Sequence, residues 1–116
     1  MAYTADQHVS AEMKQCLDNC SSCHDICLTT VAHCLQMGGK HADAAHITLL
    51  LDCAQICETS ADAMLRHSTQ SATICRACAD ICRACAVSCD KLSMSDCAAA
   101  CRKCAESCTK MAGLKM

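Results

Sequence analysis

The chain has 116 residues and a net charge of −2, and it contains 16 Cys but no Phe, Trp or Pro. This length fits a single domain over residues 1–116, and the near-neutral charge argues against a disordered chain. Scattered basic residues offer no patch for nucleic acid or an anionic membrane surface, and no stretch is long and apolar enough to span a bilayer. The core must therefore consist mainly of thiols and alanine methyl groups.

The first half of the chain is predicted to form two helices. Thr4 and Gln7 fit a capping box that opens a helix running to about Met37, where Gly38-Gly39 ends it. The second helix begins around residues 41–43 and runs to about Arg66. The inner face of the first carries Met13, Cys16, Cys20, Cys23, Cys27, Thr30 or Val31, and Cys34. The inner face of the second, which is poorer in sulfur, carries His46, Leu50, Cys53, Cys57, Ser60, Met64 and His67.

The second half is predicted to form two more helices. Polar residues 68–71 turn the chain into the third helix, and Ser93 with Asp96 fits a capping box that opens the fourth. Their inner faces carry Cys75, Cys78, Cys82, Cys85 and Cys89, and then Met94, Cys97, Cys101, Cys104, Cys108 and Met111. Steps of three and four residues keep these side chains on one face of each helix. Because the connections are short, we predict an all-α, up-down-up-down antiparallel four-helix bundle with a cysteine-lined core.

Apolar residues also fall outside these inner faces. Two interpretations are open: they fill the shoulders between helices, or they cover an interface between subunits. They are Ile47, Leu51, Ile74, Ile81 and Val87.

The thiols have three possible roles, of which metal binding fits best. Cβ atoms at i and i+4 on a helix lie roughly 5–6 Å apart, whereas a disulfide needs about 3.5–4.5 Å. Plain packing would be served by Leu or Ala without the oxidation hazard. The first 14 residues lack a basic and then apolar export signal, so we expect a reducing cytosol and free thiols.

The choice of metal rests on softness and coordination number. Zinc favours closed tetrahedral sites, and we expect a continuous stripe not to divide into groups of four. Iron–sulfur clusters favour loop-borne cysteines. Cu(I) is the soft ion that thiolates select, and a linear S–Cu–S unit needs sulfurs on the order of 4–5 Å apart, which an i, i+4 pair can reach. Only Cys34 and Cys75 have no partner in such a pair. They would need a thiol on another helix, or a His or Met, as second ligand.

The C-x-x-x-C pairs on all four predicted helices, together with the run His33-Cys34-x-x-Met37, resemble the bacterial copper storage protein family. The resemblance covers essentially the whole chain and implies a bundle that binds many Cu(I) ions on its cysteines, without a catalytic step. It also implies the cytosolic branch and a tetramer of bundles, with a copper donor or chaperone as a possible partner. The chain lacks the Met-rich loop of some exported relatives and has His41 and His46 instead.

Two other classes of protein stay open. C-x-x-C spacings occur also in ferredoxins and thiol oxidoreductases, although there they lie in loops or open a helix. A zinc-buffering protein is the other alternative.

Both bundle ends carry soft or borderline ligands. One end gathers His33, Cys34, Met37, His41, His46, Cys89, Met94 and Cys97. The other gathers Met13, Met64, His67, Cys75, Cys108 and Met111. We expect ions to load at the first end, because imidazole and thioether need no thiol deprotonation and suit a site that passes ions inward. At the second end, the methionines can equally be core plugs.

Overall fold

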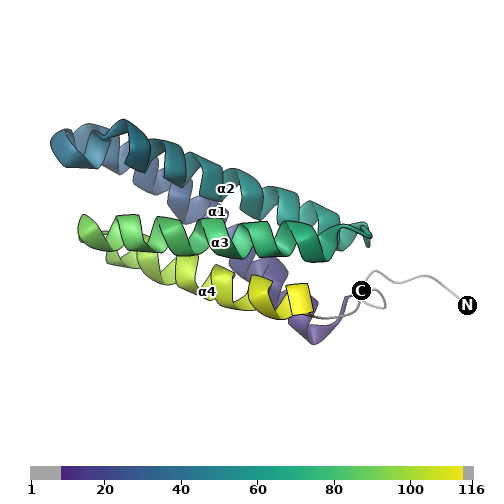
Figure 1. The fold of residues 1–116 in the computed structure, drawn as a ribbon. Helices are drawn as coiled ribbons and strands as arrows, with labels where there is room; N and C mark the ends of the chain where they lie inside the picture. The colour runs from purple at the N-terminus through teal and green to yellow at the C-terminus, as the bar shows by residue number, and fades with distance from the viewer. Residues whose placement is uncertain (1–8, 114–116) are drawn as a thin grey trace, which may run out of the picture.

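Four long helices pack side by side. Successive helices run in opposite directions (Figure 1). The structure is a computed structural model that describes residues 9–113. α1 packs against α2 and α4, and α3 packs against the same two helices, so the four form a ring around one core. The predicted all-α bundle is confirmed. The elements are α1 (Ala11–Met37), η2 (Gly39–Ala42), α2 (Ala44–Leu65), α3 (Ser71–Lys91) and α4 (Ser95–Gly113).

The 3–4 spacing of cysteine explains which face of each helix is buried. All sixteen thiol side chains are buried, with exposed fractions of 0–2%. A second line of small residues on α3 and α4 lets these helices approach closely, and its members are Ala79, Ala86, Ala98 and Ala105. Thr30 rather than Val31 completes the inner face of α1. Of the apolar residues off the seam, Ile47 and Ile81 pack partly against the core, whereas Leu51 and Val87 are exposed.

α1 begins later than the sequence predicts. The Ser10 hydroxyl accepts a hydrogen bond from the Met13 backbone N–H at 3.1 Å, so Ser10 is the N-cap. The predicted capping box at Thr4 and Gln7 lies outside the described residues. Gly38, with φ of 71°, ends α1 as predicted, and its N–H donates to the Cys34 carbonyl at 3.1 Å. The 3₁₀ turn η2 that follows was not predicted.

α2 and α3 both end in a Schellman motif without glycine. After α2, the Ser68 N–H donates to the Ala63 carbonyl at 2.9 Å, and His67 has φ of 52°. After α3, the Met94 N–H donates to the Cys89 carbonyl at 2.8 Å, and Ser93 has φ of 59°. These turns contradict two predictions, the place of His67 on the inner face of the second helix and the capping role of Ser93.

His67 is exposed in a turn and does not line the core. Ser93 is the left-handed residue of the turn after α3, so it does not cap the fourth helix, which begins at Ser95. Within residues 9–113, no helix has both the length and the apolar character needed to cross a membrane.

Candidate metal centre

The four inner faces bring the thiols together in one column along the bundle axis. The i, i+4 pairs Cys23/Cys27 and Cys78/Cys82 have Sγ–Sγ distances of 4.0 and 3.9 Å. These pairs lie at or just below the lower limit of a linear S–Cu–S separation, about 4–5 Å, so small χ1 rotations suffice to hold Cu(I). All sixteen cysteines are free thiols.

Thiols on different helices come closer still. The Sγ atoms of Cys53 on α2 and Cys82 on α3 are 3.6 Å apart. Cys104 on α4 lies 3.6 Å from both Cys20 on α1 and Cys57 on α2. A metal ion can therefore be coordinated by two thiolates of one helix or by thiolates of different helices, and neighbouring ions can share a thiolate.

Overlapping groups of four thiols can be distinguished along the column. Five groups have all four sulfurs within 4.8 Å of one another. The reason is the register between helices, which sets thiols of three helices at the same height. Three of the groups have no residue in common, and the other two are built from the same cysteines. Short contacts such as Cys57–Cys104, at 3.6 Å between sulfurs, cross between the groups that share no residue, so the column stays continuous.

Four cysteines lie outside these groups, at the ends of the column: Cys16, Cys34, Cys75 and Cys89. Cys16 contacts Cys108 at 3.6 Å between sulfurs. The other contacts fit the prediction that Cys34 and Cys75 need partners from elsewhere, because Cys34 Sγ lies 3.5 Å from His46 Nε2, and Cys75 Sγ lies 3.3 Å from the Ser60 hydroxyl.

His46 is held in place from both sides of its ring. It is only 5% exposed, and its Nδ1 lies 2.7 Å from the Ser88 hydroxyl on α3. With Nδ1 engaged by Ser88, Nε2 is directed at Cys34, an arrangement typical of metal-binding histidines. Sequence reasoning did not single out Ser88. Its only signal is its place next to Cys89, at the same end of the bundle as His46.

The residues that the sequence predicts for loading do not all line the same groove. His33 and Met94 line a groove between α1 and α4 that reaches Cys97. His46 lines a different groove between α2 and α3. Met37, the last residue of α1, is 57% exposed, and His41 is half-buried in η2. Thus His33, Met94 and Cys97 line one groove, and His46 lines another.

At the opposite end of the bundle, methionines close the core. Met13, Met64 and Met111 are 6%, 0% and 2% exposed and belong to the same packed cluster as the thiols. Their burial agrees with the interpretation of these residues as core plugs.

Burial and hydrogen bonding shift the thiol pKa values in both directions. The hydrogen bond to Cys108, together with burial, raises the pKa of Cys16 and of Cys75. Burial, and then the nearby Cys97 thiolate, raises the pKa of Cys34. Inside the column, hydrogen bonds, above all with Cys101, lower the pKa of Cys53 to about 7. Metal ions that bind these thiols must displace protons from the end cysteines.

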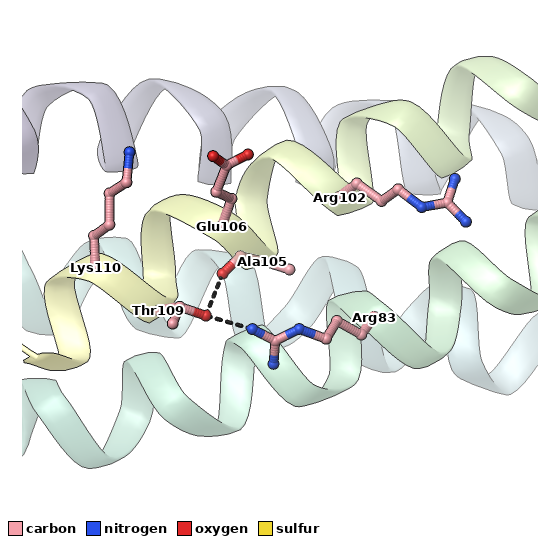
Figure 2. A pocket seen from close by; sticks show the side chains of 6 residues that line it. All are labelled: Arg83, Arg102, Ala105, Glu106, Thr109 and Lys110. Carbon is pink, nitrogen blue, oxygen red and sulfur yellow. Dashed lines mark hydrogen bonds between the residues drawn. The ribbon is translucent and has the colours of Figure 1, made fainter.

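A polar groove on the outside of α3 and α4 has no thiol in its lining. Figure 2 shows Arg83 reaching across from α3 to the Thr109 hydroxyl, which in turn donates to the Ala105 carbonyl. Arg102 pairs with Asp90 instead. The guanidinium groups are thus engaged by neighbouring helices, and this face is a solvated surface rather than a site for a soft cation.

The fold and the thiol column define a class of protein: a helical bundle that binds soft metal ions on buried cysteines. The model of one family, the copper storage protein family, matches residues 9–113. The chain belongs to the copper storage protein family, as the sequence pattern indicated. A search among curated protein sequences gives no match.

Solved structures agree with this assignment. The chain is similar to the Nmul_A1745 protein from Nitrosospira multiformis, with 46% identity over 90% of this chain and 97% of that one, and a TM-score of 0.86. It is also similar to Cu(I)-bound copper storage protein BsCsp3, with 35% identity, 88% and 99% coverage, and a TM-score of 0.81. The apo form of copper storage protein 3 from Bacillus subtilis matches with 36% identity, 86% and 98% coverage, and a TM-score of 0.73.

Proposed function

We propose that this protein stores and detoxifies Cu(I) in the cytoplasm, and that all sixteen core cysteines are its ligands. The main support is the unbroken column of free, buried thiols, because thiolates select Cu(I) over harder ions. A relative with 35% identity is itself a Cu(I)-bound copper storage protein. Free thiols in such number also suit a reducing compartment.

Charge balance sets the capacity. A buried ion pair is tolerated only if its charges are compensated, and one Cu(I) per thiolate leaves the core neutral. We therefore expect saturation near one Cu(I) per cysteine. Anaerobic titration with Cu(I), followed by metal analysis, measures this ratio. Saturation at about four ions per chain would contradict a continuous store and indicate separate four-thiolate sites.

We infer that ions load at the end that carries His33, Met37, His41, His46 and Met94. Support comes from the closeness of His46 to Cys34 and from the groove in which His33 and Met94 approach Cys97. Each path leads from a borderline or soft ligand near the surface to a buried thiol. The other end offers closely packed methionines.

We also propose that the protein forms a homo-oligomer, a tetramer by family resemblance, and receives copper from a donor protein. Support for self-association comes from large apolar side chains exposed along the helices. These are Leu28 and Leu35 on α1, Leu51 and Leu65 on α2, and Val87 on α3, with exposed fractions of 42–57%. Sedimentation of the purified protein tests the tetramer.

A further inference from the structure

Three of the four-thiol groups can be occupied at the same time, because they share no cysteine. Each has the same construction: one i, i+4 pair from one helix and one cysteine from each of two others. The pair comes from α4 in the two outer groups and from α2 in the middle group, while α1 and α3 supply the single cysteines. The groups are Cys20, Cys78, Cys104 and Cys108; Cys23, Cys53, Cys57 and Cys82; and Cys27, Cys85, Cys97 and Cys101.

In each of these groups all four sulfurs lie within 4.8 Å of one another, and several separations match the edge of a tetrahedron around a divalent ion. With a zinc–sulfur bond of about 2.3 Å, the edge of a regular ZnS₄ tetrahedron is about 3.8 Å. The measured edges include 3.6 Å for Cys20–Cys104, 3.7 Å for Cys23–Cys53 and 3.9 Å for Cys27–Cys101. These separations are shorter than a linear S–Cu–S unit requires, about 4–5 Å. Small side-chain rotations are therefore enough to bring each group into tetrahedral coordination.

We propose that the same core also binds Zn(II), as three discrete ions in Cys₄ sites, whenever Cu(I) does not fill it. The four ligands of each site come from three helices, so each ion cross-links the bundle. The end cysteines Cys16, Cys34, Cys75 and Cys89 take no part. This role goes beyond copper storage and uses the column in a second coordination geometry.

Charge makes the zinc state the weaker of the two. Zn(II) with four thiolates keeps two negative charges in a buried site, whereas Cu(I) with an equal number of thiolates is neutral. The softer ion also has the higher affinity for thiolate. Cu(I) therefore displaces Zn(II), and zinc protects the thiols only until copper arrives.

Anaerobic titration with Co(II), a spectroscopic substitute for Zn(II), tests this directly. Tetrahedral thiolate coordination gives Co(II) intense visible bands that the hydrated ion lacks. We expect these bands to saturate at three ions per chain. Adding either Zn(II) or Cu(I) to the Co(II)-loaded protein should then abolish them. Absent thiolate bands, or saturation at a different number, would overturn the proposal.

Two matched variants distinguish discrete sites from loose binding. Cys53→Ser breaks the middle group and leaves at most two disjoint groups, so we expect two Co(II) ions. Cys34→Ser removes a thiol outside every group, so three should remain. Cys85→Ser, which also leaves two, replaces Cys53→Ser if that variant does not fold. Equal Co(II) counts in the Cys53 and Cys34 variants would overturn the proposal.

Copper titration of the same samples keeps the two functions separate. Each single variant should lose about one Cu(I), because each loses one thiolate. A protein that stores copper but shows no cobalt thiolate bands refutes only the zinc sites. A protein that binds three Co(II) but no more than a few Cu(I) refutes only the copper store.

Discussion

Ser60 places a hydroxyl among the thiols of the column. Its side chain is fully buried on the inner face of α2, with its hydroxyl 3.3 Å from Cys75 Sγ and 4.0 Å from Cys108 Sγ. A thiol here would have two sulfur neighbours, as the other members of the column do. Serine and cysteine differ by one atom, so the fold tolerates the exchange.

We predict that Ser60→Cys raises the Cu(I) capacity by about one ion per chain, because each added thiolate balances one more Cu(I). Anaerobic titration against a coloured chelator measures the change. Ser107→Cys is the matched control, since Ser107 is 8% exposed and its hydroxyl bonds to Asn19 and the Cys104 carbonyl outside the column. An equal gain in both variants would show that added thiols bind copper wherever they lie.

Ser88 contacts His46, so in the proposed loading path its hydroxyl would orient the imidazole rather than bind the ion. We predict that Ser88→Ala slows Cu(I) uptake by about 10-fold, the lower end of the 10–100-fold loss of metal affinity that removing such a supporting hydrogen bond typically causes. Final capacity should not change. Ser88→Thr keeps the hydroxyl and should restore the rate. Stopped-flow transfer from a chelator measures uptake, and slow transfer in the Thr variant too would indicate a packing defect instead.

At the level of the helices, the seams could be predicted because helical periodicity acts within a single segment. Alternating steps of three and four placed Cys75 through Cys89 on one face, and the structure buries all of them. The turns could not be predicted as well. Left-handed backbone normally signals itself by glycine, and His67 and Ser93 adopt it without one, at a cost of about 1–2 kcal/mol each.

Contacts between helices were the other limit of sequence reasoning. Spacing along one helix shows that its thiols lie in a line. Their position along the bundle axis relative to thiols on neighbouring helices depends on the register between the helices. This register sets Cys53 beside Cys82 and Cys104 beside Cys20, and so brings thiols of three helices into each four-thiol group. The bond between Ser88 and His46 is hidden for the same reason, since it joins α3 to α2.

The proposed loading site lies at the ends of the helices. We predict that replacing His33, Met37 and His46 together by non-ligating residues slows Cu(I) uptake from a competing chelator and leaves the capacity almost unchanged, because these residues lie outside the thiol column. Replacing Met13, Met64 and Met111 by Leu is the comparison at the other end. Slow uptake in the methionine variant but not in the first would place the loading site at the opposite end of the bundle.

For the whole molecule, the metal-free protein is stabilised by protons held on the thiols at the ends of the column. The pKa values of Cys16, Cys34 and Cys75 are raised above the ordinary 9.0, so the unfolded chain releases these protons at lower pH than the folded one. Their stabilising contribution is complete below pH 9.0 and is lost as the pH rises above it. We predict that the melting temperature of the metal-free protein falls between pH 9 and 10 under anaerobic, reducing conditions, as followed by circular dichroism.

Among the described residues, the core contains no aromatic residue, and Leu50 is its one fully buried Leu. Apolar burial therefore stabilises the metal-free protein only weakly, and copper loading should add most of the stability. An ion that binds only the folded state stabilises it by about 4 kcal/mol at a free concentration 1,000 times its Kd, and many ions act together. We predict that the Cu(I)-loaded protein melts far above the metal-free protein at pH 7, and that its melting temperature no longer falls above pH 9, since bound thiolates have no proton to lose. Calorimetry of both forms tests this. If the two forms melt together, the ions bind outside the thiol column, whatever the titrated capacity.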